Sequence, residues 1–224
     1  MDAVSARTPT GYDLVIFDCD GVLVDSEALA CDCLVELLQR HGIDVELDAV
    51  FERFLGRSIS AVAEHFQALG CAMPAGFPAE LRVLVRKSFA GSLQAMADVE
   101  SVLRSLETAY CVASSSDLER VNFSLELTGL SALFVGRVFT AQMVQNGKPA
   151  PDLFLYAAAS MAVEPRRTLV IEDSVSGVQA GKAAGMTVWG FVGGSHYASR
   201  DGRALLAAAG ADRVFDRMAD FRRH

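Results

Sequence analysis

The sequence predicts an α/β protein, a doubly wound parallel sheet with a helical unit inserted into it. Four consecutive apolar residues at 14–17 are typical of a strand buried on both faces, as in parallel sheets that helices cover. From residue 99 onward, predicted helices alternate with predicted strands. Between 26 and 91 the pattern is helical and no strand is convincing, so we expect a separate helical unit between the first strand and the others.

The composition is that of a folded, acidic protein. Of the 224 residues, 51% are hydrophobic, enough for one large core or for a core with a small second domain. The formal net charge is −8 and the basic residues are scattered, which argues against a nucleic-acid surface. No apolar run approaches the roughly 20 residues that span a bilayer, and residues 1–10 lack the apolar core of a signal peptide. We expect a cytoplasmic protein with a frayed N-terminus that binds neither nucleic acid nor membrane.

The five cysteines indicate packing rather than zinc or disulfide chemistry, because their number is odd and their spacing is not of the zinc type. Cys31 and Cys33 fall in a predicted helix, where residues two apart point away from one another. Cys19 lies between two aspartates, whose charge would raise the pKa of its thiol. We expect all three to act as small apolar side chains.

The first strand ends in two carboxylates, Asp18 and Asp20. At the end of an extended segment, residues two apart lean to the same side, and Gly21 lets the chain turn sharply. Open α/β sheets bind their ligands at this carboxyl edge. Two carboxylates so close are costly unless a cation lies between them or one is protonated. The motif therefore predicts a metal or proton site. Ordinary loop aspartates, one of them capping the next helix, are the alternative.

The segment after this motif changes to helical periodicity, and Ser26 can cap its first helix. The predicted helices cover residues 27–40, 49–55, 59–69 and 78–89. We assign 26–91 to the helical unit, and 11–25 together with 92–224 to the sheet domain.

A helix predicted at 99–106 leads to a second strand at 110–113, which ends in serines at 114–116. Small hydroxyl residues just before a helix at 118–128 suit a phosphate site, because a hydroxyl and backbone N–H groups converge at a helix N-terminus. A plain helix cap is the alternative.

A short strand at 137–140 precedes Lys148 and Pro149, and a helix follows them to about residue 161. Pro149 stiffens the chain beside Lys148, so we expect the lysine to be oriented. A solvated loop lysine is the alternative.

Another buried strand, at 168–171, ends in Glu172 and Asp173, and a helix begins at Ser174. Acidic pairs at the ends of two different strands are harder to explain as helix caps than one pair alone. The segments 187–192, 203–209 and 213–215 supply further strands and a helix.

These motifs resemble, in order, the four motifs of the haloacid dehalogenase superfamily. The matching residues are Asp18 to Val22, Ser114, Lys148 with Pro149, and Glu172 to Ser174. The helical insert resembles the subgroup with a helical cap, which includes β-phosphoglucomutases and small sugar-phosphate phosphatases. The resemblance covers the chain from about residue 12 onward. It implies a sheet in which the first strand is central, flanked by the strands of Ser114 and of Glu172.

The resemblance also implies a phosphatase that forms an aspartyl-phosphate. Asp18 would be the nucleophile, and Asp20 would protonate the leaving alcohol and then deprotonate the attacking water. Ser114 and Lys148 would hold the phosphoryl oxygens, and Ser115 would bind substrate beside them.

By the same resemblance, a Mg²⁺ ion would be the cofactor. Its ligands would be Asp18, the backbone carbonyl of Asp20, and Asp173, with Glu172 in or just outside the coordination shell. The ion would offset the repulsion between an anionic nucleophile and a phosphate ester.

The cap would contribute the substrate contacts. Arg57 lies in a segment that resembles the cap loop facing the leaving group, and it would pair with a carboxylate or second phosphate. An exposed arginine on a helical turn is the alternative. Lys87, or its neighbour Arg86, would add a second positive charge. Mutase-like members commonly carry a histidine where this chain has Ala30, which favours a phosphatase.

We therefore expect the substrate to be a small phosphorylated metabolite, a sugar or sugar-acid phosphate, and the protein to be a monomer, with a weak homodimer as the alternative. Two other functions stay open. One is a sugar phosphomutase. The other is a catalytically silent binding module that keeps the fold, against which the intact Asp18 and Asp20 argue.

Overall fold

The computed structural model describes residues 11–55, 59–71 and 73–222. The expected frayed N-terminus and Arg57 lie outside these ranges. In the described chain, six parallel strands form one sheet in the order β3-β2-β1-β4-β5-β6. Their bounds are β1 Leu14–Phe17, β2 Ala109–Ser114, β3 Val138–Thr140, β4 Thr168–Glu172, β5 Thr187–Phe191 and β6 Arg213–Phe215. The first strand is central, between β2 and β4, so the predicted doubly wound α/β fold is confirmed.

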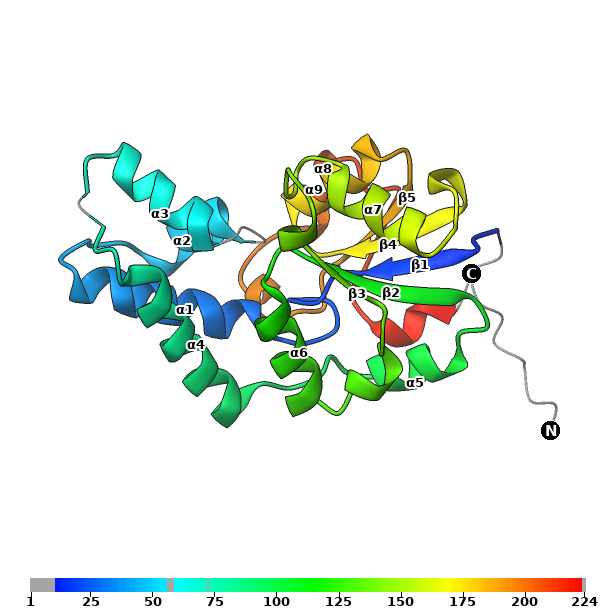
Figure 1. The fold of residues 1–224 in the computed structure, drawn as a ribbon, viewed down its shortest axis with the longest axis horizontal. Helices are drawn as coiled ribbons and strands as arrows, with labels where there is room; N and C mark the ends of the chain where they lie inside the picture. The colour runs from blue at the N-terminus through cyan, green and yellow to red at the C-terminus, as the bar shows by residue number, and fades with distance from the viewer. Residues whose placement is uncertain (1–10, 56–58, 72, 223–224) are drawn as a thin grey trace.

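Helices cover both faces of the sheet (Figure 1). They are α5 Val99–Ser105, α6 Leu118–Leu127, α7 Asp152–Ser160, α8 Val175–Ala183 and α9 Gly202–Ala208. Short 3₁₀ turns join them at Ser131–Leu133, Ala141–Met143, Pro165–Arg167, Ser195–Tyr197 and Met218–Arg222. Alternate residues of β1 serve the two layers. Leu14 and Ile16 belong to the core under α7 and α8, and Val15 and Phe17 to the core under α5 and α6. All four are buried, which explains the unbroken apolar run in the sequence.

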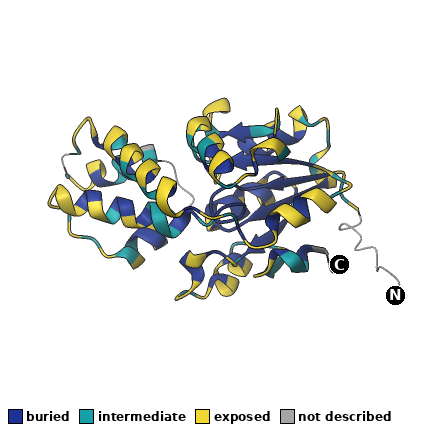
Figure 2. Ribbon diagram, turned by 90° about the horizontal axis from the view of Figure 1, so that it is seen from below, coloured by how far each residue is buried: buried dark blue, intermediate teal, exposed yellow. Residues whose placement is uncertain are grey.

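Four further helices form a separate helical lobe, α1 Glu27–Arg40, α2 Leu47–Phe54, α3 Ile59–Ala68 and α4 Phe77–Ser92. In this lobe α1 packs against α2 and α4, and α3 packs against α4. Figure 1 shows the lobe beyond the carboxyl ends of the strands, and Figure 2 shows that it has a buried interior of its own. The helices expected between 26 and 91 are confirmed.

The two connections between the lobe and the sheet lie side by side. Val24 forms an antiparallel bridge with Ala95, the Met96 N–H donates to the Leu23 carbonyl at 2.9 Å, and the Asp25 N–H donates to the Gln94 carbonyl at 3.0 Å. The chain therefore leaves and re-enters the sheet domain at one place, next to the end of β1.

One predicted helix cap is wrong. Ser26 precedes α1, but its side chain makes no capping hydrogen bond, because its hydroxyl donates to the Asp20 carboxylate at 2.7 Å. Asp117, not a serine of 114–116, caps α6 by accepting from the Arg120 N–H at 2.9 Å. The serines that follow β2 are therefore left for another role.

Cys19, Cys31 and Cys33 are buried and unbonded, as the packing prediction requires. Among the helices of the described ranges, none could span a bilayer.

Candidate active site

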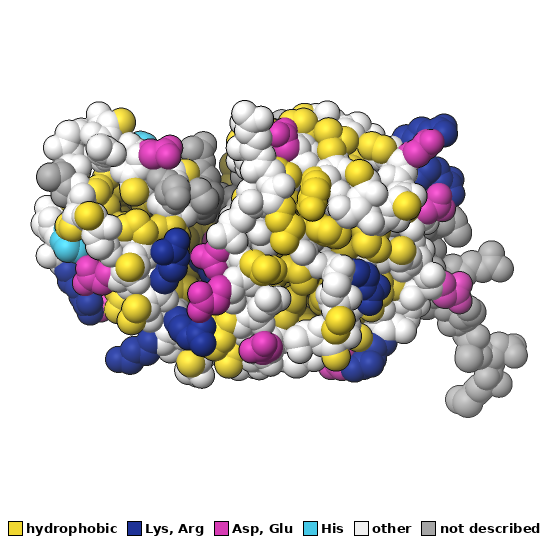
Figure 3. Space-filling view, viewed as in Figure 1, with side chains coloured by type: hydrophobic (Ala, Val, Ile, Leu, Met, Phe, Trp, Pro, Cys, Tyr) yellow, Lys and Arg dark blue, Asp and Glu magenta, His cyan; other side chains and the backbone are white. Residues whose placement is uncertain are grey.

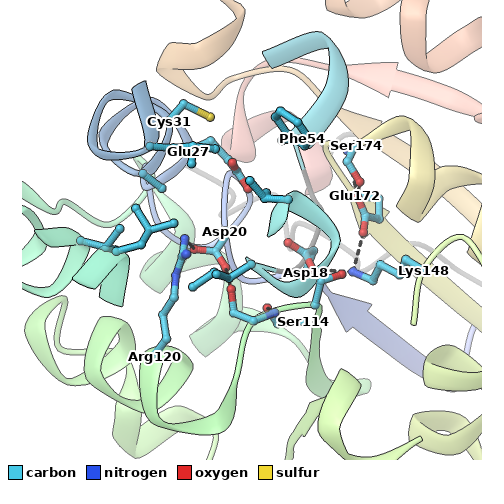
Figure 4. A pocket seen from close by; sticks show the side chains of 18 residues that line it. Asp18, Asp20, Glu27, Cys31, Phe54, Ser114, Arg120, Lys148, Glu172 and Ser174 are labelled. Atoms are coloured by element: carbon cyan, nitrogen blue, oxygen red, sulfur yellow. Dashed lines mark hydrogen bonds and ion pairs between the residues drawn. The ribbon is translucent and has the colours of Figure 1, made fainter. Parts of the chain in front are cut away.

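The strand register brings the motifs together. Phe17 of β1 lies level with Val112 of β2 and Ile171 of β4, so Asp18 and Glu172 emerge at the same edge of the sheet. A cavity of about 60 Å³ lies between this edge and the helical lobe (Figure 4). Its sheet side is lined by Asp18, Asp20, Ser114, Ser115, Ser116, Arg120, Lys148, Glu172 and Ser174. Its lobe side is lined by Glu27, Ala30, Cys31, Leu34, Phe54, Ile59, Val62, Leu81 and Val85.

Lys148 joins two of the strand-end acids. Its Nζ lies 2.5 Å from Asp18 Oδ1 and 2.6 Å from Glu172 Oε1, and it donates to the Ala113 carbonyl at 3.0 Å. The side chain is only 1% exposed, so the solvated-lysine alternative is wrong. Burial alone would lower the pKa of Lys148, but Asp18 and Glu172 more than offset that effect and raise it. The site therefore contains a fixed ammonium group.

Asp18 and Asp173 are buried carboxyls whose negative charge is not fully offset by neighbouring groups. Burial is the largest cause that raises the pKa of each carboxyl well above its usual range, and repulsion from Glu172 adds to it. Asp173 is 1% exposed, and its Oδ2 has no hydrogen-bond partner in the described structure. Such groups require a proton or a cation.

These donors fit a hard divalent cation in their chemistry. Asp18 and Asp173 offer carboxylate oxygens, which suit Mg²⁺. Both oxygens of Glu172 are already engaged, Oε1 by Lys148 and Oε2 by the backbone and hydroxyl of Ser174, each at 2.9 Å. Within the described residues no three His, Cys, Asp or Glu side chains converge on a ready-made metal cage.

Gly21 lets the chain approach Asp173. Its φ is +77°, and a Cβ on this residue would lie 1.8 Å from Asp173 Oδ2.

Two aromatic residues also contact Asp173. The Tyr197 hydroxyl donates to the backbone carbonyl of Asp173. His196 Nε2 lies 3.1 Å from Asp173 Oδ2 but is not aligned for a hydrogen bond. Burial lowers the pKa of His196.

Asp20 has a different environment from Asp18. Its Oδ1 accepts from the Ser26 hydroxyl at 2.7 Å and from the Arg120 guanidinium at 2.8 Å, and its Oδ2 accepts from the Ser116 hydroxyl at 2.6 Å. Burial alone would raise the pKa of Asp20, but Arg120 and the two hydroxyls hold it below its usual value. The environment of Asp18 therefore favours the protonated carboxyl, whereas that of Asp20 favours the carboxylate, although the two residues are only two apart.

Ser114 and Ser115 lie where the sequence places them, at the edge of the cavity beside Lys148. The Ser114 hydroxyl oxygen accepts from the Ser116 N–H at 3.1 Å. Its own proton stays available to a ligand. A wider groove of about 400 Å³ adjoins the cavity and shares Ser115, Lys148 and Arg120 as lining residues.

The predicted second positive charge does not come from Lys87. That side chain is exposed on α4 and does not line the cavity. Arg86 pairs instead with Glu119 at 3.4 Å, in the seam between the lobe and the sheet domain where Figure 3 shows basic and acidic side chains side by side. Among the described residues, the second basic side chain that lines the cavity beside Lys148 is Arg120 on α6, which was not among the predicted site residues. The one signal for it was a basic residue in the first turn of the helix after the serines.

Glu27 is the one acid on the lobe side of the cavity within the described chain. Burial, followed by the charges of Asp173 and Asp20, raises the pKa of Glu27 to about 8. The remaining lobe-side residues are apolar.

The fold and this edge define an α/β enzyme whose charged centre lies at the ends of parallel strands. Residues 12–185 match the family of haloacid dehalogenase-like hydrolases, and the chain belongs to this family. The 6-phosphogluconate phosphatase of Escherichia coli (strain K12) is 30% identical over 186 residues, which cover 82% of this chain and 84% of that protein.

Two solved structures show the same fold. A haloacid dehalogenase-like protein from Agrobacterium tumefaciens str. C58 has a TM-score of 0.80 and 34% identity, covering 94% of this chain and 96% of that one. A HAD family hydrolase from Deinococcus radiodurans R1, with bound phosphate and sodium, has a TM-score of 0.74 and 32% identity, covering 95% of this chain and 94% of that one.

Proposed function

We propose that the protein is a Mg²⁺-dependent phosphatase that hydrolyses a sugar or sugar-acid phosphate through an aspartyl-phosphate on Asp18. The observation that carries this proposal is the buried contact between Asp18 and Lys148, beside Ser114, in a chain of the haloacid dehalogenase-like hydrolase family. A nucleophile, a fixed cation and a hydroxyl donor thus face one cavity.

In the first half of the reaction, Lys148 and the Ser114 hydroxyl would bind phosphoryl oxygens of the ester. An Asp18 oxygen attacks phosphorus, the bond from phosphorus to the leaving oxygen breaks, and a proton from Asp20 neutralises the leaving alcohol. Lys148 offsets the charge of Asp18 while the two anions approach.

Asp18, the backbone carbonyl of Asp20, and Asp173 would hold the Mg²⁺ ion. When bound, the ion supplies positive charge that lowers the repulsion between carboxylate and phosphate. Glu172, whose oxygens are both engaged, would act from outside the coordination shell by orienting Lys148.

We also propose that residues 26–91 form a cap over the core of residues 11–25 and 92–224. The apolar side chains that the lobe presents to the cavity support this role, because they would exclude bulk water around the phosphoryl group. The adjoining groove of about 400 Å³ gives room for the sugar, which the cavity of about 60 Å³ does not.

Hydrolysis is favoured over mutase activity by Ala30. This residue lines the cavity, and by the resemblance it stands where mutase-like members of the family commonly carry a histidine. The name of the Escherichia coli relative, a 6-phosphogluconate phosphatase, supports a sugar-acid phosphate as the substrate.

A panel of sugar and sugar-acid phosphates, incubated with the purified protein with and without Mg²⁺, tests the proposal. We expect inorganic phosphate to be released from at least one of them only when Mg²⁺ is present. With a hexose 1-phosphate we expect free sugar and phosphate. Quantitative conversion to the 6-phosphate with little phosphate released would make the protein a mutase, and no reaction in any arm would contradict both assignments.

A further inference from the structure

Arg120 is a partly buried cation that contacts Asp20, and the proposed chemistry gives this contact no role. It lies in the first turn of α6, its side chain is 20% exposed, and its guanidinium donates to Asp20 Oδ1 at 2.8 Å. Its Nε is buried without a hydrogen-bond partner in the described structure. Arginine is not deprotonated in proteins, so the guanidinium keeps its charge.

Within the described residues, Arg120 is the one charged donor among the three that hold Asp20. Ser26 comes from the start of the lobe and Ser116 from the loop after β2, so three separate segments fix one carboxylate. Hydroxyls orient a carboxylate, but of these three donors only the guanidinium also offsets its charge.

The guanidinium is itself held in place from both domains. Its centre lies 5.1 Å from the centroid of the Phe89 ring, which α4 carries. The backbone N–H of Arg120 donates to Asp117, so the start of α6 is also fixed. The guanidinium therefore lies between Asp20 and the Phe89 ring.

We propose that Arg120 is a positioning residue for the second half of the reaction, in which it holds Asp20 as an oriented carboxylate that accepts the proton of the attacking water. This inference rests on the proposed function. The water oxygen bonds to phosphorus, the bond from phosphorus to Asp18 breaks, and its electron pair returns to the Asp18 carboxylate. The water proton passes to Asp20, and inorganic phosphate leaves. Asp20 then carries the proton that a leaving alcohol needs in the next turnover.

A substrate with a good leaving group separates the phosphorylation of Asp18 from the hydrolysis of the aspartyl-phosphate. p-Nitrophenolate leaves without a proton, so the transfer of its phosphoryl group to Asp18 does not need Asp20, whereas hydrolysis of the aspartyl-phosphate does. For Arg120→Met we expect kcat on p-nitrophenyl phosphate to fall about tenfold to a hundredfold. KM should fall in parallel, so that kcat/KM changes by less than about threefold.

The steady-state amount of phosphorylated enzyme supplies a second readout. Because only the second step slows, the fraction of Arg120→Met enzyme that carries acid-stable phosphate during turnover should rise well above that of the wild type. Arg120→Gln, which keeps a neutral but shorter donor, should change kcat and KM in the same direction. Arg120→Lys, which keeps the charge, should recover part of kcat.

Arg86→Met is the matched control, because Arg86 also lies in the seam between α4 and α6 but pairs with Glu119 rather than Asp20. It should leave kcat, KM and the phosphorylated fraction close to those of the wild type. Circular dichroism and thermal unfolding of each variant monitor the fold.

Three outcomes would overturn the inference. These are an unchanged kcat in Arg120→Met, an equal fall in kcat and kcat/KM in both Arg120→Met and Arg120→Gln, or the same changes in Arg86→Met. If wild type and all Arg120 variants release phosphate but never carry it, the aspartyl-phosphate of the proposed function fails, whatever the role of Arg120. The two failures are therefore distinguishable.

Discussion

The two sides of the cavity differ in chemistry and in the way their residues are held. The sheet side carries Asp18, Asp20, Lys148 and Arg120, each fixed by hydrogen bonds or ion pairs. The lobe side is apolar except for Glu27 and is held by the packing of helices. The difference supports our proposal that bond making and breaking belong to the sheet edge, and that the lobe excludes water and limits which substrates fit.

Asp18→Asn should have the largest effect on the sheet side. An amide has nearly the volume of the carboxylate but cannot attack phosphorus, so turnover should be abolished while the fold stays intact. Phosphate release and thermal unfolding measure the two quantities. Substantial activity in a correctly folded Asp18→Asn protein would move the chemistry away from this residue.

Lys148→Met should have the second-largest effect on turnover. Losing the ammonium group removes a phosphoryl ligand and should lower kcat about a hundredfold or more. It also leaves Asp18 and Glu172 without their buried partner, and the free energy of unfolding should fall by about 3–5 kcal/mol. Lys182→Met is the control, because its pair with Asp212 is more than one-third exposed. Equal losses in the two variants would argue against a special role for Lys148.

Two glycine substitutions test whether the site depends on the close approach of Gly21 to Asp173. Gly21 and Gly42 have similar positive φ values, +77° and +75°, but a Cβ would meet Asp173 only at Gly21 and has open space at Gly42. Gly42→Ala should therefore cost only the backbone penalty, about 1 kcal/mol of unfolding free energy, and leave turnover unchanged. Gly21→Ala should cost more and lower turnover by displacing Asp173. Equal effects in urea unfolding and in activity would mean that the contact does not matter.

The pH dependence of protein stability tests the environment of Glu27, on the lobe side of the cavity. Its carboxyl has an ordinary pKa of 4.5 and a raised pKa of about 8 in the folded protein, so the folded state binds the extra proton between these values. The free energy of unfolding should therefore fall as pH rises from about 5 to about 8, by at most about 1.4 kcal/mol per pH unit from this group.

In Glu27→Gln this decline should be weaker. Urea unfolding in the presence of EDTA at several pH values measures it. Glu36→Gln, an exposed position on the same helix, is the control and should follow the wild type. If Glu27→Gln also follows the wild type, Glu27 ionises in the folded protein as it would in water.

The sequence predicted the site residues at strand ends better than those on helices, for a physical reason. Buried strands show as apolar runs, and the ends of parallel strands share one edge, so the residue pattern was enough to place Asp18, Glu172 and Asp173 together. The position of a side chain on a helix surface depends on which neighbour packs there. Residue type alone could not show that Lys87 is exposed and that Arg120 reaches Asp20.

Ser26 illustrates the same limit at short range. Its place before α1 predicts a cap, which is a local contact, but the Asp20 carboxylate competes for the hydroxyl and takes it. An acceptor six residues away in the sequence is brought near by the turn at Gly21, and a pattern of capping residues contains no information about that turn.

The most direct test of the central claim is to locate the phosphoryl group during turnover. The enzyme is mixed with Mg²⁺ and its best sugar phosphate, quenched in acid during steady-state turnover, digested, and analysed by mass spectrometry. We expect a phosphoryl group on the peptide that contains Asp18, and none on that peptide from the Asp18→Asn variant. Full-rate phosphate release with this peptide unmodified, or with the phosphoryl group on another residue such as Ser114, would contradict the account.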